Sequence, residues 1–362
     1  MVVKARTFLF LLLGLGVVAG CDDDDLPGFG PGPRFFPTTA SLLSTGNPFK
    51  DEDPSVIRAH DGSMVVAFFS DRSDGAGDIF IMRDPEAEKW SEPKRVTFAP
   101  EGDFYPTIFQ DASGLYHLVW HRWYDFFRGH IMHSTSPSGF EWIVANEESV
   151  TTTPDVDDWL PTPVIANDGT LFIYFVSEIR DFSNPTSDIY VVFKGPTDTS
   201  WSAPATVTTL NSATEHDQLP FVTRTGNTLT MVWVRHDTSE ALPWLNPKSN
   251  LFISTSNDGV AWTPPLQITN DVGNVVHLFP SIYSTGSDQR ILWLSNRGGP
   301  ARPYELPLSK VGQYPAEAVE VTILPDGYSH RVAPTPTPGV YLGVWVQGPE
   351  GTQDVFYRFF ER

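Results

Sequence analysis

Short apolar runs, each bounded by glycine or proline turns, recur along most of the chain and predict many short β-strands. In six places a proline precedes such a run, and successive prolines are separated by roughly 50–60 residues. These prolines are Pro54, Pro106, Pro161, Pro220, Pro280 and Pro334. A turn such as Asp61-Gly62 or Asp168-Gly169 follows each first strand. The chain therefore contains six copies of one structural repeat.

Each repeat holds further predicted strands. The second strands are rich in β-branched and aromatic residues and cover Met64–Phe69, Leu115–Trp120, Leu171–Val176, Leu229–Val234, Ile291–Leu294 and Val340–Val346. The third strands cover Asp78–Met82, His130–Ser134, Asp188–Phe193, Asn250–Ser254, Tyr304–Leu308 and Asp354–Phe359. A fourth strand, such as Lys94–Phe98, ends each of the first five repeats. Four antiparallel strands at this spacing predict an all-β fold, a six-bladed β-propeller over residues 38–362.

The two ends of the chain are expected to complete one blade together. The sixth repeat stops after its third strand, at Arg362. The segment Ala40–Thr45 precedes the first repeat, in the place that Lys94–Phe98 holds before the second. Pairing of this N-terminal strand with Asp354–Phe359 completes the last blade, closes the ring and leaves no open edge between the first and last blades.

Two segments carry resemblances to known propeller groups. The first repeat resembles that of TolB-like propellers in its motifs Asp51-Glu52-Asp53-Pro54, Asp61-Gly62, Ser70-Asp71-Arg72 and Asp78-Ile79-Phe80. Thr255–Trp262 resembles the Asp-box (BNR repeat) of sialidases, with Asn257 where aspartate is usual, and Thr135–Trp142 is a weaker copy with Pro137 there. The sialidase resemblance implies a β-turn between the third and fourth strands, away from any active site. These turns are therefore expected to be structural.

The first residues indicate export. An apolar run from Phe8 to Val18 follows two basic residues and is about half as long as a bilayer span. It ends in Val18-Ala19-Gly20-Cys21, which resembles the lipobox of bacterial lipoproteins. The resemblance implies that residues 1–20 are a signal peptide and that Cys21 is acylated. The protein would then be lipid-anchored in the bacterial cell envelope, in the periplasm or at the cell surface. Cys21 is the only cysteine, so no disulfide is possible within one molecule.

Residues 21–37 are expected to form a tether, because four aspartates (Asp22–Asp25) precede a stretch rich in glycine and proline. The formal net charge of −20 argues against nucleic acid as a partner and against adhesion of the domain itself to anionic lipid. The lipid anchor is therefore the expected contact with the membrane. Neither a cofactor nor a metal site is expected. The one combination that could hold a metal is His216-Asp217 together with His236. We expect a monomer.

Strand order locates the expected ligand site. Residues before each proline and after each second strand should surround one mouth of the central channel, where propellers generally bind ligands. Aromatic rings beside charged groups suit sugars, since rings stack on apolar sugar faces and charged groups bind hydroxyls. The candidate ligand-binding residues are Asp103, His121, Arg122, Trp123, Asp158, Glu178, Arg180, His216, Asp217, Arg235, His236 and Arg297.

Three classes of function fit this pattern. We favour binding of a glycan or another envelope ligand, without an assigned catalytic residue. A sialidase-like glycoside hydrolase is the second class, since Asp103, Asp158, Glu178 and Asp217 supply candidate acids and bases. A TolB-like scaffold for envelope proteins is the third, in which these aspartates only pair with arginines or turn amides. The sialidase Arg-Ile-Pro segment has no true match, because Arg331-Val332-Ala333-Pro334 is one residue longer and lies in the last repeat.

Overall fold

The computed structural model describes residues 40–44, 48–73, 76–84, 89–125, 128–178, 187–207, 209–212, 214–236, 248–286 and 288–362. The expected signal peptide, Cys21, the tether and Arg180 lie outside the described residues. Residues Pro37–Arg362 form one compact unit, and the description below concerns that unit alone. No helix in the described ranges is long and apolar enough to cross a membrane.

Almost all regular secondary structure in the described chain is antiparallel β-strand, which confirms the expected all-β propeller class. The first repeat is a four-stranded sheet of β2 (Asp51–Arg58), β3 (Met64–Ser70), β4 (Asp78–Asp84) and β5 (Lys94–Arg95). The second repeat contains β6 (Gly102–Gln110), β7 (Tyr116–Asp125), β8 (Arg128–Ser136) and β9 (Glu148–Ser149). The third contains β10 (Asp157–Ile165), β11 (Leu171–Glu178), β12 (Ser187–Lys194) and β13 (Ala205–Thr206). One parallel pair, Asp157 with Gly129, joins these two repeats into an eight-stranded sheet.

The second half of the chain forms three more four-stranded sheets. The fourth repeat contains β14 (His216–Thr225), β15 (Thr228–His236), β16 (Ser249–Ser256) and β17 (Leu266–Gln267). The fifth contains β18 (His277–Thr285), β19 (Asp288–Ser295), β20 (Arg302–Pro307) and β21 (Val319–Glu320). The sixth contains β22 (Tyr328–Pro334), β23 (Val340–Gln347) and β24 (Asp354–Glu361). The described helical segments are two short 3₁₀ turns, η1 (Val144–Asn146) and η2 (Leu308–Lys310).

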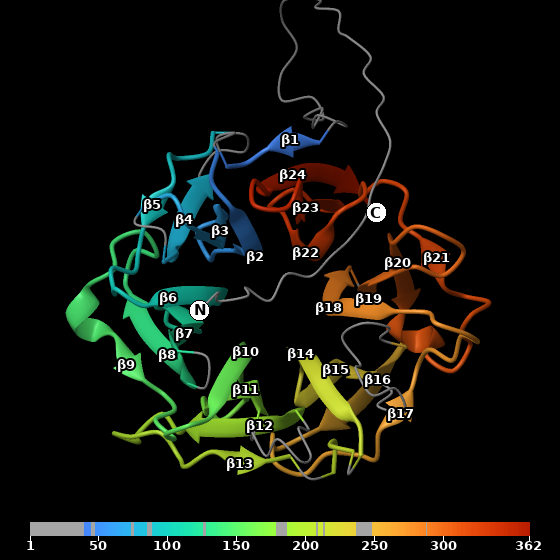
Figure 1. Ribbon diagram of the computed structural model, residues 1–362, viewed down its shortest axis with the longest axis horizontal. Coiled ribbons are helices and arrows are strands. Elements are labelled where there is room, and N and C mark those ends of the chain that lie inside the picture. Colours follow the sequence, from blue (N-terminus) through green and yellow to red (C-terminus); the bar gives the residue numbers. More distant parts are fainter. Residues whose placement is uncertain are drawn as a thin grey trace, which may run out of the picture. The chain divides into compact units, whose positions relative to one another are not determined.

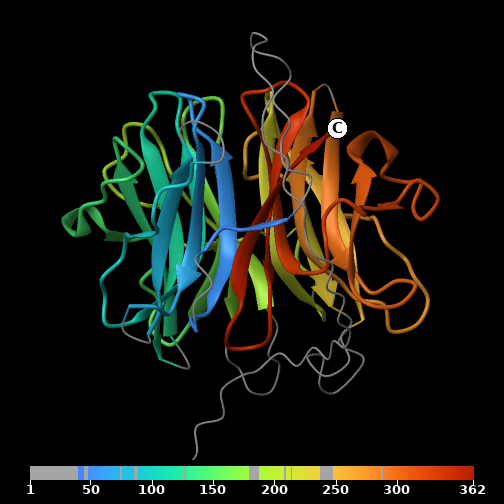
Figure 2. The same ribbon diagram turned by 90° about the horizontal axis from the view of Figure 1, so that it is seen from above.

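The sheets stand in a ring, with the first strand of each repeat innermost (Figure 1). These innermost strands are β2, β6, β10, β14, β18 and β22. Figure 2 shows the strands running along the axis of the ring. Residues from all the repeats therefore meet at the centre, although they are far apart in the sequence.

The N-terminal strand completes the last sheet, as the sequence predicts. Strand β1 (Ser41–Leu42) pairs with β24 through Ser41 opposite Tyr357 and Leu42 opposite Phe356. The next residue, Leu43, is buried and donates its N–H to the carbonyl of Val355 at 2.8 Å. The sixth repeat therefore also has four strands, in the order β1-β24-β23-β22.

Every innermost strand contains a β-bulge at the same place. The pairing of β2 with β3 is interrupted between Glu52 and Ser55, and Asp53 within the bulge has a φ of 53°. The equivalent residues, also with φ of 52° or 53°, are Tyr105, Leu160, Leu219, Phe279 and Ser329. Positive φ is costly for residues other than glycine, and bulges redirect side chains near functional sites.

The proline follows the bulge residue instead of opening the strand. In the sixth repeat the bulge spans Ser329 and His330, so His330 holds the place of the other five prolines. Pro334 is the last residue of β22. The expected alignment of the sixth repeat on Pro334 is therefore four residues late, because the bulge depends on the φ of the preceding residue and does not require proline.

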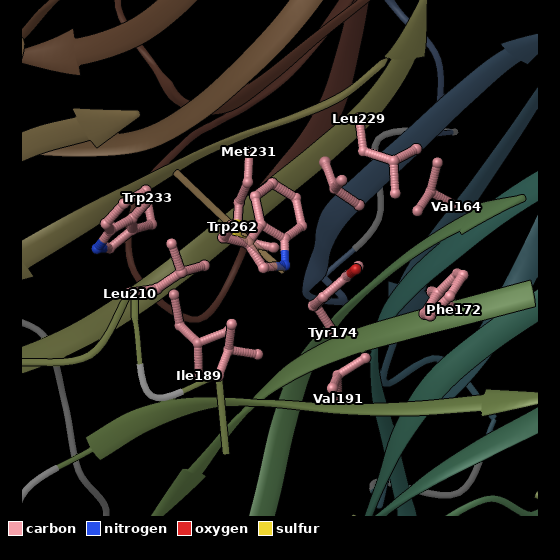
Figure 3. Close-up of a cluster of buried hydrophobic side chains, with 12 residues drawn as sticks. Val164, Phe172, Tyr174, Ile189, Val191, Leu210, Leu229, Met231, Trp233 and Trp262 are labelled. Carbon is pink, nitrogen blue, oxygen red and sulfur yellow. The ribbon is translucent and has the colours of Figure 1, made fainter. Parts of the chain in front are cut away.

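Aromatic side chains fill the spaces between neighbouring sheets. Trp120, Trp233, Trp293 and Trp345 lie on the second strands of their repeats and are almost completely buried. Between the third and fourth repeats, Trp233 joins a cluster of apolar side chains from both sheets (Figure 3). Burial of such rings is the main stabilising contribution available to stacked sheets.

The turn that resembles an Asp-box lies between β16 and β17, and its contacts are structural. Asp258 accepts hydrogen bonds from the N–H groups of Val260 and Ala261 at 2.9 and 2.8 Å. Gly259 has a φ of 77°, and a Cβ there would lie 2.7 Å from the Phe172 ring. Its carbonyl accepts a 2.7 Å hydrogen bond from the Tyr174 hydroxyl. The turn thus docks the fourth repeat on the third.

Candidate functional site

A buried ion pair lies at the inner side of the second repeat. Asp103 is fully buried and binds Arg122 through two hydrogen bonds, Nε to Oδ1 at 2.8 Å and Nη2 to Oδ2 at 2.9 Å. Trp120 donates its indole N–H to the same Oδ1 at 2.9 Å. Arg122 also binds Glu147 at 2.9 Å. Both charges of this pair are satisfied by the protein.

The fourth repeat contains the same arrangement. Asp217 is fully buried and accepts hydrogen bonds from Arg235 at 2.8 and 3.1 Å and from the Trp233 indole at 2.7 Å. Arg235 also donates to the carbonyl of Leu210 at 2.6 Å. The arginine lies directly opposite the aspartate on the neighbouring strand of the same sheet. These four candidate residues of the two repeats therefore hold their own sheets together.

The third and fourth repeats bring several other candidates close together. Asp158 accepts a 2.6 Å hydrogen bond from Ser177, and burial raises its pKa to about 6. Ser187 donates its backbone N–H to His216 Nδ1 at 3.0 Å, and its hydroxyl lies 3.5 Å from Glu178. His236 lies opposite His216, and burial lowers its pKa to about 4. No group of three or more side chains suited to a metal ion occurs within the described part of the chain.

Arg297 lies in the fifth repeat, away from these pairs. Its guanidinium carbon lies 4.8 Å from the centre of the Tyr314 ring and 5.5 Å from that of Tyr304. Its Nη1 is buried without a hydrogen-bond partner in the described ranges. Cation–π contacts thus hold this side chain against the loop that precedes β21.

His121 and Trp123 both lie on β7 of the second repeat. The ring of His121 is buried, and its Nε2 lies 3.2 Å from Asp157 Oδ1. Gly129 allows this contact, because a Cβ there would lie about 2 Å from the imidazole. Trp123 is 38% exposed and packs edge-on against Phe104. Trp123 thus supplies an accessible aromatic surface on the second repeat.

The bulges bring together a group that the sequence analysis did not select. We call Glu52, Asp53, Tyr105, Asp157, Tyr328 and Arg331 the central cluster. They come from β2, β6, β10 and β22, which are inner strands of four repeats. The sequence does carry a signal for them, since Asp53 and Tyr105 stand directly before the repeated proline.

Glu52 and Tyr328 connect the first and sixth repeats. The Tyr328 hydroxyl donates a hydrogen bond of 2.5 Å to Glu52 Oε1. Lys50 lies 2.7 Å from the other oxygen of the same carboxylate. Burial and the negative charge of Glu52 raise the pKa of Tyr328 well above its ordinary value. The phenol therefore stays protonated and acts as a donor.

Asp53 differs from its neighbour Asp51. Asp51 is fully buried and binds Arg72 at 2.7 Å. The side chain of Asp53 is half-buried and has neither a hydrogen bond nor an ion pair with any described residue. Burial, followed by the charge of Glu52, raises the pKa of Asp53 to about 8. Asp53 is therefore largely protonated at pH 7, and its carboxyl group can both donate and accept hydrogen bonds.

Tyr105 lies between Asp53 and the third repeat. Its ring stacks on His121 at 6.2 Å between centroids and lies 6.1 Å from Trp159. Its hydroxyl has no hydrogen-bond partner among the described residues. Burial raises its pKa, and so do the nearby carboxyl groups of Asp53, Glu52 and Asp157. A neutral phenol is thus free to bind a ligand at the ring centre.

The remaining inner strands present apolar residues at the same level. The bulge positions of the third, fourth and fifth repeats hold Leu160, Leu219 and Phe279. The bulge positions are therefore polar in the sixth, first and second repeats and apolar in the third, fourth and fifth. Such a two-sided site matches a sugar, which has polar edges and an apolar face.

Comparison with known proteins supports the fold. No family model and no curated protein sequence matches the chain. An α-L-arabinofuranosidase of Fusarium graminearum, solved with an iminosugar inhibitor, has a TM-score of 0.69 at 13% identity, covering 91% of this chain and 98% of that one. An α-L-arabinanase of Penicillium chrysogenum, complexed with arabinobiose, has a TM-score of 0.68 at 15% identity, covering 89% and 98%. A Hadza microbial sialidase has a TM-score of 0.60 at 11% identity, covering 86% and 65%.

Proposed function

We propose that this protein binds a glycan at the centre of the propeller ring, through the central cluster. The observation that carries the proposal is the pair of unused polar groups on Asp53 and Tyr105, which have no hydrogen-bond partner among the described residues. Folding alone does not favour unpaired polar groups in half-buried positions, so they indicate a ligand site. His121 contacts Tyr105 and so borders this site, and Trp123, the exposed ring on the same strand, remains part of the proposal.

Two further observations support a sugar as the ligand. The centre combines hydrogen-bonding groups with the aromatic rings of Tyr105, Trp159 and Phe279. Both arabinan-active enzymes that resemble this chain were solved with sugar-like molecules, an iminosugar inhibitor and arabinobiose. A pentose-containing oligosaccharide such as arabinobiose is therefore among the first ligands to test.

Binding to a glycan array, followed by calorimetric titration of the best ligand, tests the proposal. We expect Tyr105→Phe to weaken binding roughly tenfold, the effect of losing one hydrogen bond in a desolvated site. Tyr190→Phe is the matched control, because Tyr190 is also half-buried but lies on β12, outside the central cluster. Equal loss in both variants, or no binding of any glycan by the parent protein, would contradict the proposal.

A glycoside hydrolase is the second candidate. Asp53 carries a proton at pH 7, while the adjacent Glu52 accepts a hydrogen bond from Tyr328. Two carboxyl groups in unlike environments are what acid–base catalysis of glycoside cleavage requires. Release of nitrophenol from aryl arabinofuranosides and other aryl glycosides, lost in Asp53→Asn, would support this candidate. A parent protein that binds glycans without cleaving them would leave recognition as the function.

We further propose that the ring has six blades. The eight-stranded sheet then counts as two blades, because only the pairing of Asp157 with Gly129 connects its halves. The six equivalent bulge residues support this count. A density map of the protein that resolves the ring in projection would test it directly.

The lipobox-like segment supports one more proposal, that Cys21 carries a lipid and anchors the domain outside the cytoplasm. Residues 22–37 then act as the tether, and the protein works as a monomer that reaches envelope glycans or, in the scaffold alternative, envelope proteins. Cys21→Ser is expected to leave an unlipidated precursor or a soluble secreted form, detected by fractionation and mass spectrometry. A membrane-bound, acylated Cys21→Ser protein would exclude this anchoring.

A further inference from the structure

The residue directly after each bulge joins neighbouring inner strands at four junctions of the ring. The Ser55 hydroxyl accepts the N–H of Ile108 at 3.1 Å, and the Thr107 hydroxyl donates to the carbonyl of Pro161 at 3.1 Å. Two further hydroxyls act in the same way: Thr162 accepts the N–H of Val222 at 3.1 Å, and Ser281 lies 3.5 Å from the carbonyl of His330. The two remaining positions are exceptions and hold Phe221 and Arg331.

These two exceptions contact each other. The guanidinium carbon of Arg331 lies 5.6 Å from the centre of the Phe221 ring. Arg331 belongs to β22 and Phe221 to β14, and β18 lies between these strands in the ring (Figure 1). The arginine side chain therefore extends from the sixth repeat past the fifth, into the interior of the ring.

Arg331 keeps most of its hydrogen-bonding capacity. A guanidinium has five N–H donors, and the described residues accept only one hydrogen bond from it, from Nη1 to the carbonyl of His330 at 3.0 Å. No described carboxylate lies within ion-pair distance of it, whereas Arg122 and Arg235 each bind an aspartate. A half-buried charge without a counter-ion is unfavourable, so a ligand that supplies an anion there binds strongly.

The neighbouring acid does not neutralise Arg331. Asp53 is the carboxyl group whose charge would act on the guanidinium, but Asp53 is largely protonated at neutral pH. The carboxylate of Glu52 is already bound by Lys50 and Tyr328. Burial lowers the pKa of Arg331 only to about 10, so the guanidinium remains charged at pH 7. Arg331 thus has no ion-pair partner among the described residues, and the nearby carboxyl group that acts on it, Asp53, has a raised pKa.

We propose that Arg331 binds the carboxylate of an acidic sugar, so that the glycan recognised at the ring centre contains a uronic acid residue. This inference rests on the proposed glycan-binding function and specifies its ligand class. A planar guanidinium matches a planar carboxylate through two parallel hydrogen bonds. The ring of Phe221 packs against the guanidinium, and Phe279, whose ring lies 5.9 Å from that of Tyr328, supplies apolar surface for the sugar ring.

The test compares tri-galacturonate with its methyl ester, since esterification removes the negative charges and adds one methyl group to each carboxyl. Calorimetric titration at low salt is expected to show tri-galacturonate binding ~10- to 100-fold more tightly than the ester. Arg331→Gln should remove this preference, and Arg331→Lys should restore only part of it because lysine lacks the planar fork. Arg58→Gln is the matched control, because Arg58 is exposed at the end of β2 and its loss changes the net charge equally.

The outcomes distinguish the proposed role of Arg331 from glycan binding as such. Equal binding of acid and ester by the parent protein, or an acid preference that survives in Arg331→Gln, overturns the role of Arg331 and leaves glycan binding in place. Absence of binding to every oligosaccharide tested, arabinobiose included, overturns glycan binding itself. If Arg331→Gln does not fold, as judged by its melting temperature, the partial restoration in Arg331→Lys still decides the question.

Discussion

Arg122 and Arg331 are two arginines near the inner strands of the ring, and they differ in how their donors are used. Arg122 binds both oxygens of Asp103 and also Glu147. Arg331 donates to one backbone carbonyl and otherwise rests on an aromatic ring. Arg122 thus connects two strands of one sheet, whereas Arg331 extends into the interior of the ring.

The difference shows why polar composition alone does not locate a ligand site. A fully paired charge stabilises the sheet that contains it and has little left to offer a ligand. Arg331, Asp53 and Tyr105 retain polar atoms without described partners, although they are partly removed from water. The comparison therefore separates groups that maintain the fold from groups available for recognition.

The largest expected effect comes from breaking a paired arginine. Asp217→Ala leaves Arg235 half-buried beside the Trp233 indole without its carboxylate, and should lower the free energy of unfolding by roughly 3–5 kcal/mol. Arg331→Gln should change it by less than about 1 kcal/mol, since no described ion pair is lost. Urea denaturation followed by tryptophan fluorescence measures both values. Similar losses in the two variants would mean that Arg331 stabilises the fold as much as the Asp217–Arg235 pair does.

A smaller effect is expected at the place where the sixth repeat lacks the aspartate. Gly327 is the counterpart of Asp103 and Asp217, three residues before the position of the repeated proline. A Cβ at Gly327 would lie 2.5 Å from the carbonyl oxygen of Val346. Gly327→Ala should therefore cost roughly 1–3 kcal/mol of stability through this clash. An unchanged melting temperature would show that the sixth sheet accommodates a side chain there.

The hydroxyl junctions provide the next test. Thr162→Val keeps the shape of the side chain but removes the acceptor for the buried N–H of Val222, at an expected cost of about 1–2 kcal/mol. Ser55→Ala should act in the same direction at the junction of the first and second repeats. Phe221→Leu, at one of the two exceptional positions, should instead weaken ligand binding more than it lowers stability. The reverse ranking would show that Phe221 serves the fold.

The sequence predicted the strands and the closure well, because both depend on local signals. Apolar runs between turns gave the second and third strands within a few residues, and the truncated sixth repeat implied the pairing of β1 with β24. The alignment of the sixth repeat on Pro334 was wrong, because the bulge that defines the repeat is a backbone feature and His330 takes the place of proline there.

The candidate site was harder to predict, because pairing between side chains is a tertiary property. Arg122 and Arg331 look alike in the sequence, and only the structure shows that Asp103 lies opposite the first. The repeated proline marks the position of the bulge, but the positive φ that redirects the side chains of Asp53 and Tyr105 is a backbone feature that their residue types do not indicate. His121, a predicted site residue, does contact the central cluster through Tyr105, whereas Trp123 packs against Phe104.

The last predicted effect is a dependence of stability on pH, caused by the charge of Asp53 itself. Burial raises its pKa from 3.8, the ordinary value in an unfolded chain, to about 8 in the folded protein. The folded state therefore holds the proton more tightly than the unfolded state. Stability should therefore fall as pH rises from about 4 to about 8, and level off above that. Asp53→Asn cannot titrate, so its advantage over the parent should grow across this window to at least about 1 kcal/mol, after allowance for solvent screening. Thermal unfolding of both proteins at successive pH values measures the difference, and Asp155→Asn, an exposed aspartate whose φ of 58° is also positive, controls for the backbone. Parallel pH curves for Asp53→Asn and the parent would mean that Asp53 is ionised in the fold, in which case it would neutralise Arg331 and the two regions would no longer differ.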